Sequence, residues 1–266
     1  MHAFVHRCVI RIGDRLDPYS CRMVNVEVRD DVGRGVVLIT LDRPERRNAV
    51  DHDTLLALSD AQRQHVDARV VVLTGTPPAF SAGADLHGVE QGVFAADLAR
   101  TLRGFTTWSA PVIGAIEGPA LGAGAQLASV CDLRVATEGS TFGVPAARLG
   151  LVVDHWTVER LAREFGWPVA RAMLLGAETY TGAELHAMGS VHRIGGLEQA
   201  LEWAAAISRL APLTIAGHKL ALESSAGEPD HDPEVEHARH RAWTSADAEE
   251  GRRAFLEKRS AAFRGE

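Results

Sequence analysis

Cysteines, long apolar runs and clustered basic residues are scarce or absent in this chain of 266 residues. Its three cysteines, Cys8, Cys21 and Cys131, form no C-x-x-C pair, so the sequence predicts neither a disulfide framework nor a thiolate metal site. No stretch approaches the roughly 18 to 20 consecutive apolar residues that a membrane-spanning helix needs. The formal net charge of -7 argues against a nucleic-acid surface, which needs clustered Lys and Arg. We therefore expect a cytoplasmic protein with no metal site, no nucleic-acid partner and no membrane span.

What the chain does have is the composition of a folded globular protein, with 46% hydrophobic and 24% charged residues. Residues 1–22 carry four arginines, but their apolar runs are too short for the core of a signal peptide. We expect this segment to be a disordered extension, or the result of a start codon chosen too early; a transit-type peptide is the alternative. The rest is expected to divide into a core at residues 23–196 and a helical C-terminal region at residues 197–266.

The order of strand and helix patterns along the chain indicates an α/β fold. Alternating apolar residues predict an opening hairpin with strands at residues 25–29 and 35–41. Further strands are expected at residues 70–73, 111–116 and 133–136, with helices at residues 55–66 and 95–107. Helical patterns dominate from residue 157 onward, at residues 158–165, 168–175, 181–188, 197–210, 212–224 and 233–263.

Two loops rich in glycine and alanine are the most informative segments, at residues 79–86 and 117–128. Each follows a predicted strand, and the second leads into the start of a helix, where free backbone N–H groups collect. Two unblocked N–H groups placed together hold a developing negative charge on a carbonyl oxygen, so the pair of loops predicts an oxyanion hole. The alternative for either loop alone is that small residues permit close packing between helices and sheet.

Six short motifs occur in order along the chain: D-R-P-x-x-x-N-A at residues 42–49, F-S-A-G-A-D-L at 80–86, G-P-A-L-G-A-G at 118–124, C-D-L-R-V-A at 131–136, F-G-V-P at 142–145 and E-G-x-x-x-F-x-x-K-R-x-x-x-F at 250–263. Through them the chain resembles the enoyl-CoA hydratase/isomerase family, the crotonase superfamily, over residues 24–265. The resemblance implies a crotonase (ClpP-like) fold, in which β-β-α units repeat in a right-handed spiral. It also implies a helical C-terminal region that forms a homotrimer, often paired into a hexamer.

The resemblance assigns roles to individual residues. In the family, two backbone N–H groups hold the carbonyl of a CoA thioester, and they correspond here to those of Ala84 and Ala123. Glycine is commoner at the position of Ala123, but alanine still supplies the amide. The residues that match CoA-binding positions are Arg46, Arg47, Ala82, Asp85 and Leu86, together with Phe255 and Lys258, which reach the CoA of a neighbouring subunit. Without the family, the last two are equally well a core phenylalanine and a surface lysine. Coenzyme A enters as part of the substrate, and no further cofactor is expected.

The chain departs from the family at the two positions where hydratases carry glutamates around the substrate double bond. These positions hold Gln126 and Ala146. Adding water to a C=C bond needs one group that deprotonates water and one that delivers a proton, and neither an amide nor a methyl group exchanges protons near neutral pH. We therefore expect binding of the thioester to survive and efficient hydration to be lost.

Asp154 is the remaining ionisable candidate, eight residues after Ala146, where some family isomerases and dehalogenases carry a working aspartate. Its functional interpretation is an acid/base group or a polar gate in the acyl pocket. The alternative is an N-cap for the helix that follows. His155 is expected to be a structural or surface residue, and Trp156 a wall of the acyl pocket.

A narrower resemblance comes from Gln126, Ala146, Asp154 and Trp156, taken with the patterns at residues 170–175 and 209–213. The combination resembles a subgroup of actinobacterial, especially mycobacterial, members that are named enoyl-CoA hydratases but are described as acyl-CoA binders serving mycolic-acid synthesis. We therefore expect a protein that binds fatty acyl-CoA thioesters, with little or no hydratase activity, and presents them to a lipid-synthesis enzyme. The alternatives are an active hydratase or isomerase that uses Asp154, and a structural subunit that has lost CoA binding.

Overall fold

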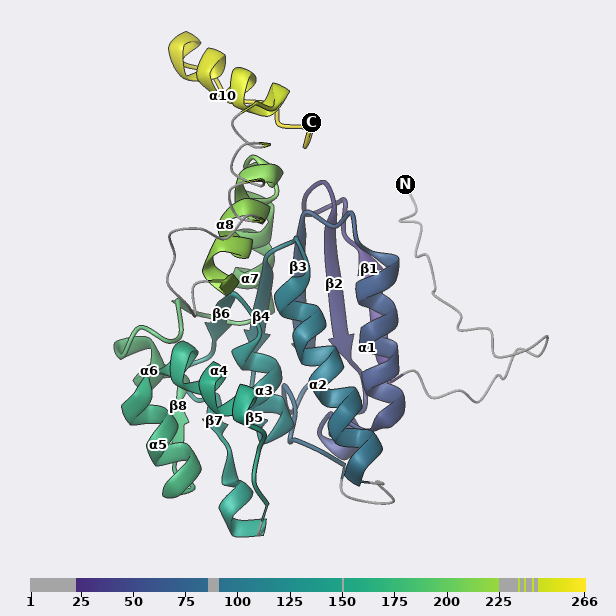
Figure 1. Cartoon of the computed structure of the whole chain (residues 1–266), viewed down its shortest axis with the longest axis vertical. Coiled ribbons are helices and arrows are strands. Elements are labelled where there is room, and N and C mark those ends of the chain that lie inside the picture. The colour runs from purple at the N-terminus through teal and green to yellow at the C-terminus, as the bar shows by residue number, and fades with distance from the viewer. Residues whose placement is uncertain are drawn as a thin grey trace, which may run out of the picture.

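The computed structural model describes residues 23–85, 91–149, 151–224, 234, 237, 241 and 244–266 (Figure 1). The expected extension at residues 1–22 lies outside this part. The strands are β1 (Val24–Val28), β2 (Val36–Leu41), β3 (Val70–Gly75), β4 (Val112–Ile116), β5 (Pro119–Leu121), β6 (Leu133–Ala136), β7 (Thr141–Gly143), β8 (Thr179–Thr181) and β9 (Arg193–Ile194). The helices are η1 (Pro44–Arg46), α1 (His52–Gln64), α2 (Gln91–Thr107), α3 (Ala123–Ser129), η2 (Pro145–Leu149), α4 (His155–Phe165), α5 (Trp167–Leu175), α6 (Gly182–Ala187), α7 (Leu197–Ile207), α8 (Pro212–Ser224) and α10 (Ala246–Glu257).

A six-stranded sheet in the order β1-β2-β3-β4-β6-β9 forms the centre of the fold. Strands β1 and β2 pair antiparallel, which confirms the predicted opening hairpin, and β2, β3, β4, β6 and β9 run parallel. Every residue of β3 and β4 is buried, as in a parallel sheet that is covered on both faces.

The two faces of the sheet carry separate cores because side chains alternate along each strand. In β2, Val37 and Ile39 face the larger core, which includes Leu55 of α1 and Phe105 of α2. Val36 and Leu38 face a smaller core on the other side, which α7 covers with Ala200, Ala204 and Ile207. Helices α1 and α2 lie side by side over one face of the sheet in Figure 1.

A second sheet of three short strands, β5-β7-β8, lies beside the large one. The chain runs from β4 in the large sheet to β5 in the small sheet and then into α3, and it repeats this course from β6 through β7 to η2 and α4. These are the repeated β-β-α units that the resemblance implied. The arrangement places β5 and α3 next to the ends of the parallel strands.

The C-terminal half differs from the prediction in its short strands and its last helix. The sequence predicted only helices after residue 157, but β8 and β9 interrupt them, and each is held by pairing with a distant strand. Within the predicted helix at residues 233–263, the structure gives α10 at Ala246–Glu257. In Figure 1, α10 lies beyond the N-terminal ends of the parallel strands. Among the described residues, no helix is both long enough and apolar enough to span a membrane.

Candidate functional site

Asn48 organises the first of the two small-residue loops. Its side-chain Oδ1 accepts a hydrogen bond from the Arg43 amide at 2.8 Å, and its Nδ2 donates to the carbonyls of Thr76 and Ala79 at 2.8 and 2.6 Å. Asn48 is buried with a φ of 55°, a left-handed conformation that asparagine tolerates better than most residues. Its carbonyl in turn accepts from the hydroxyl of Ser81 at 2.8 Å, so one residue joins the loop before α1 to the loop after β3.

Replacing Asn48 with alanine is expected to lower the free energy of unfolding by about 2–4 kcal/mol. The substitution leaves the Arg43 amide and two carbonyl groups without their side-chain partner, and a buried unsatisfied group costs about 1–3 kcal/mol. Chemical denaturation of wild type and variant measures the difference. A loss below about 1 kcal/mol would show that water or a shifted backbone takes over these bonds.

The structure brings the two small-residue loops together, as the oxyanion-hole prediction requires. Ser81 and Ala120 form a parallel bridge, in which the Ser81 amide donates to Pro119 and the Leu121 amide donates to Ser81, both at 2.9 Å. A Cβ on Gly124 would lie 2.3 Å from the Ser81 carbonyl oxygen, and a Cβ on Gly83 would lie 2.9 Å from that of Leu121. Glycine is therefore needed at both positions for the backbones to approach each other.

The two amides predicted as oxyanion donors lie on either side of this contact. The bridge between Val50 and Ala84 uses the Val50 and Asp85 amides, at 2.7 and 2.8 Å from their acceptors, and so does not use the Ala84 amide. In α3 the Gln126 amide makes the first bond, to Gly122, so the Ala123 amide precedes the helical hydrogen bonds. The position of a Cβ on Gly83, 3.7 Å from the Ala123 nitrogen, places the loop of Ala84 next to that amide.

The residues predicted to bind CoA lie in two parts of the chain, one around the first loop and one in the C-terminal region. Arg46 and Arg47 are exposed, and the Arg47 carbonyl accepts from the Ala82 amide at 2.9 Å, so these residues lie at one edge of the first loop. The Asp85 carboxylate instead pairs with Arg43 at 3.1 Å, which also binds Asp51 at 2.7 Å. Asp85 therefore anchors the loop. Lys258 is exposed near the end of α10, while Leu86 and the side chain of Phe255 lie outside the described part of the chain.

Gln126 and Ala146 stand on two different elements near the start of α4. The Gln126 side chain is 7% exposed, and its Oε1 accepts a weak hydrogen bond from the Thr157 hydroxyl at 3.4 Å. Ala146 lies in η2 and packs against the larger core. Neither side chain offers a proton to a ligand near neutral pH, which leaves this part of the site without an acid or a base of its own.

Asp154 is the N-cap of α4, which confirms the structural alternative for this residue. Its Oδ1 accepts from the Thr157 amide at 3.0 Å, and the side chain is exposed. A catalytic role for Asp154 stays a prediction. His155 is a surface residue, 3.4 Å from Glu159. Trp156 is half-buried against the larger core, and the Arg103 guanidinium lies 5.6 Å from its ring centroid.

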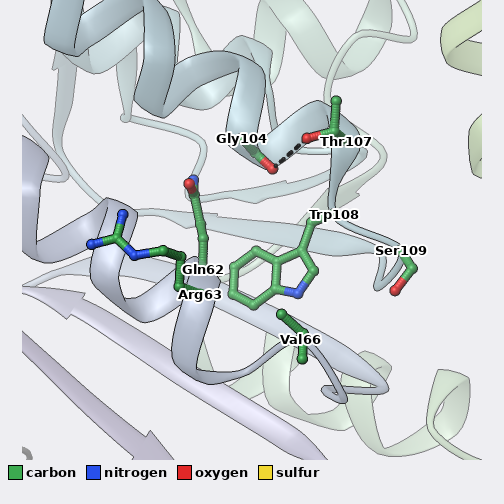
Figure 2. Close-up of a pocket in the computed structure, with 7 residues that line it drawn as sticks. All are labelled: Gln62, Arg63, Val66, Gly104, Thr107, Trp108 and Ser109. Carbon is green, nitrogen blue, oxygen red and sulfur yellow. Dashed lines mark hydrogen bonds between the residues drawn. The ribbon is translucent and has the colours of Figure 1, made fainter.

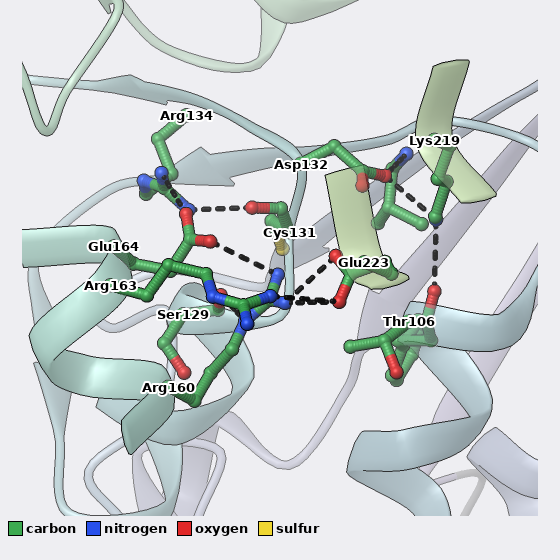
Figure 3. Close-up of polar contacts among 12 residues, drawn as sticks. Thr106, Ser129, Cys131, Asp132, Arg134, Arg160, Arg163, Glu164, Lys219 and Glu223 are labelled. Atoms are coloured by element: carbon green, nitrogen blue, oxygen red, sulfur yellow. Dashed lines mark hydrogen bonds and ion pairs between the residues drawn. The ribbon is translucent and has the colours of Figure 1, made fainter. Parts of the chain in front are cut away.

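The sequence did not predict the residues whose side chains hold the second loop and the C-terminal end of α3 in place. The Glu117 carboxylate, at the first residue of that loop, accepts from the Leu197 amide of α7 at 2.9 Å. Arg134 and Arg160 lie buried at the far end of α3, where they contact backbone carbonyls and acidic side chains (Figure 3). Arg134 sits inside a motif, but its partner Glu164 is 30 residues away, and Arg160 binds Ser129 and Glu223 across 31 and 63 residues. Burial raises the pKa of the neighbouring Cys131 thiol to about 12, so that thiol stays protonated.

A hollow of about 380 Å³ between α1 and α2 contains none of the predicted site residues. Figure 2 shows the Trp108 ring in its wall, close to Val66 and Gln62. The Trp108 indole N–H donates to the His65 carbonyl at 3.2 Å, and the Gln62 amide donates to the Thr101 carbonyl at 3.0 Å. These polar groups bind the two helices to each other. Across the described ranges, no cluster of three or more His, Cys, Asp or Glu side chains is arranged to hold a metal ion.

Comparisons with known proteins show what the chain as a whole is similar to. The family model described as "Enoyl-CoA hydratase/isomerase" matches residues 31–266. The chain is 42% identical over 241 residues to "Probable enoyl-CoA hydratase echA6" of Mycobacterium leprae, covering 87% of this chain and 96% of that protein. It is 33% identical to the 2,3-dehydroadipyl-CoA hydratase of Escherichia coli, covering 86% and 95%. The crystal structure of an enoyl-CoA hydratase from Bacillus anthracis superposes with a TM-score of 0.82 at 27% identity, covering 92% and 100%.

Proposed function

Because this chain belongs to the enoyl-CoA hydratase/isomerase family, whose crotonase fold it shares, we propose that it binds fatty acyl-CoA thioesters and has little hydratase activity. The observation that carries the proposal is the joined pair of loops, which brings the segment before Ala84 next to the Ala123 amide. Gln126 and Ala146 stand where the resemblance places the two glutamates of family hydratases. Two amide donors bind a thioester carbonyl, but they do not move the protons that hydration requires.

The first loop also indicates where the CoA part of the ligand binds. We assign Arg46 and Arg47, beside Ala82, to the phosphates, since exposed guanidinium groups at the edge of the site attract negative charge. CoA belongs to the substrate, so the proposal includes no other cofactor. The proposal includes a trimer, because α10 lies at the end of the sheet away from these loops. Lys258 would therefore reach the CoA bound to a neighbouring subunit more readily than the CoA bound to its own subunit.

The biological role that fits these properties is a carrier in fatty acid or mycolic acid metabolism. The similarity to a mycobacterial protein supports this setting. Such a carrier, acting in the cytoplasm, would hold the acyl-CoA and present it to an enzyme of lipid synthesis.

Calorimetric titration with saturated acyl-CoAs of increasing chain length tests the proposal, together with a crotonyl-CoA hydration assay on the same sample. We expect binding that strengthens with chain length, by about 0.8 kcal/mol for each CH₂ group that is fully buried, and hydration close to background. Efficient hydration would overturn the carrier function. Absence of any acyl-CoA binding would favour a structural subunit.

The second candidate function is an active hydratase or isomerase that uses Asp154, whose exposed carboxylate binds the Thr157 amide at the start of α4. Replacing Asp154 with asparagine separates the two roles of the residue, because asparagine caps a helix about as well as aspartate but cannot accept a proton. We expect any residual turnover of enoyl-CoA to stay within about twofold of wild type. A loss of 100-fold or more, of the size typical for a lost acid/base group, would establish Asp154 as catalytic.

A further inference from the structure

Two buried guanidinium groups hold the end of α3 that lies away from Ala123. The Arg160 Nε donates to the Ser129 carbonyl at 2.9 Å. The Arg134 Nη1 donates to the carbonyls of Ala128 and Cys131 at 3.3 and 2.5 Å. The last carbonyls of a helix have no partner within it, so these bonds satisfy groups that burial would otherwise leave unpaired. Figure 3 shows Arg160 and Arg134 converging on this end of the helix.

Arg160 is itself held by an acidic residue from the C-terminal region. Its Nη1 donates to both carboxylate oxygens of Glu223 on α8, at 2.8 and 2.6 Å. Glu164 lies between the two arginines, 3.3 Å from Arg160 and 2.6 Å from Arg134. Arg160 is 5% exposed, and a buried cation that loses its counterion is strongly disfavoured. The position of Arg160 therefore depends on Glu223, which binds it at the shorter distances, together with Glu164.

Lys219, one helical turn before Glu223, fixes α8 against the segment that follows α3. Its Nζ donates to Asp132 at 2.8 Å and to the carbonyls of Phe105 and Ala110 at 2.9 and 3.0 Å. Burial raises the pKa of Asp132, and the charge of Lys219 opposes that shift. Helix α8 thus makes two charged contacts near the C-terminal end of α3, one through Lys219 and one through Glu223. The Lys219 contact fixes the position of α8 and therefore that of Glu223.

Helix α4 contacts α3 at matching positions along both helices. Thr157 reaches Gln126 at 3.4 Å, and Arg160, three residues later, reaches Ser129, three residues after Gln126. Helix α3 has seven residues, all of them buried, and spans about 10 Å. A helix this short moves as one body, because interiors are close-packed and bend little. A shift at Ser129 is therefore passed to Ala123.

We propose that Arg160, held in place by Glu223 of α8, is a positioning residue for the Ala123 amide. It fixes the far end of α3 and thereby the distance between that amide and a bound thioester carbonyl. This inference rests on the proposed function, in which Ala123 is one of two donors to the thioester. It makes helix α8, in the C-terminal region, part of the support of the site.

The test compares octanoyl-CoA with S-octyl-CoA, a thioether that lacks only the carbonyl oxygen. Binding of both to the full chain is measured by calorimetry for wild type, Glu223→Gln and Arg160→Lys. Glutamine keeps the shape of Glu223 without its charge, and lysine cannot reach Ser129 and Glu223 with separate nitrogens. In both variants we expect the affinity for octanoyl-CoA to fall about fivefold, the value of one hydrogen bond, and that for S-octyl-CoA to stay within about twofold.

The matched control is Glu159→Gln, which removes an exposed carboxylate 3.4 Å from His155 on the same helix and should change neither affinity. The carbonyl stretching frequency of bound ¹³C-labelled octanoyl-CoA gives a second readout, which should move toward its value in water in Glu223→Gln and Arg160→Lys alone. Equal weakening of both ligands, or no weakening, would show that Arg160 only stabilises the fold and would overturn the inference. A wild-type protein that does not prefer the thioester would instead contradict the proposed function itself.

Discussion

Replacing both Gln126 and Ala146 with glutamate is expected to raise the rate of crotonyl-CoA hydration at least 100-fold above wild type. The reason is that each acid/base group contributes about 10²- to 10⁴-fold, while the chain keeps the two backbone donors that we propose polarise the thioester. Gln126 is 7% exposed, and a carboxyl group at this position would have its pKa raised by burial, as a proton donor near neutral pH requires. The measurement is the initial rate of hydration at saturating crotonyl-CoA.

The control for the glutamate pair is Ala147→Glu combined with Gln126→Glu. Ala147 is the exposed neighbour of Ala146, so this variant carries the same charge with one carboxyl group directed elsewhere. We expect it to gain far less than the designed pair, because the two groups act as a unit and their effects do not add. A designed variant that folds and binds acyl-CoA but hydrates no faster than wild type would show that more than the two glutamates has been lost.

Replacing Gly124 with alanine is expected to weaken octanoyl-CoA binding about tenfold or more and to lower the free energy of unfolding by about 1–3 kcal/mol. The added Cβ would lie 2.3 Å from the Ser81 carbonyl oxygen and 2.8 Å from the Ser81 Cβ, so the two loops must separate. Their separation moves the Ala123 amide away from that of Ala84. Calorimetry and chemical denaturation measure the two effects.

Gly139→Ala is the matched control for this substitution, because a Cβ there has no neighbour within 4 Å among the described residues. It should leave both binding and unfolding near their wild-type values. If Gly124→Ala binds octanoyl-CoA as tightly as Gly139→Ala does, the close approach of the two loops is not needed for the ligand.

The site could be predicted from the sequence where short motifs carry it. The two small-residue loops could be recognised because each follows a predicted strand and is rich in glycine and alanine. They meet because the strands that precede them, β3 and β4, are parallel neighbours in the sheet. The N-cap role of Asp154 also follows from local sequence, because the cap and the amide it accepts from are three residues apart. Local signals of this kind need no knowledge of the tertiary structure.

The small sheet and the buried ion pairs could not be predicted in the same way. Strands β5, β7 and β8 have three residues each, too few to show a period of two, and they exist because they pair with one another. Arg160 and Glu223 are 63 residues apart, and Lys219 and Asp132 are 87 apart. Arg160, Lys219 and Glu223 occur in ordinary helical patterns, and Asp132 lies in the motif before β6. Nothing in the local sequence marks either pair as partners.

The proposed function requires the wild-type protein to recognise a thioester carbonyl with the amides of Ala84 and Ala123. Calorimetric titration of the wild-type chain with octanoyl-CoA and S-octyl-CoA, under identical conditions, tests it most directly. We expect octanoyl-CoA to bind about tenfold more tightly or better, since two hydrogen bonds of about 1 kcal/mol each distinguish the ligands. Equal affinity for the two ligands would contradict it, because the carbonyl would then contribute nothing to binding.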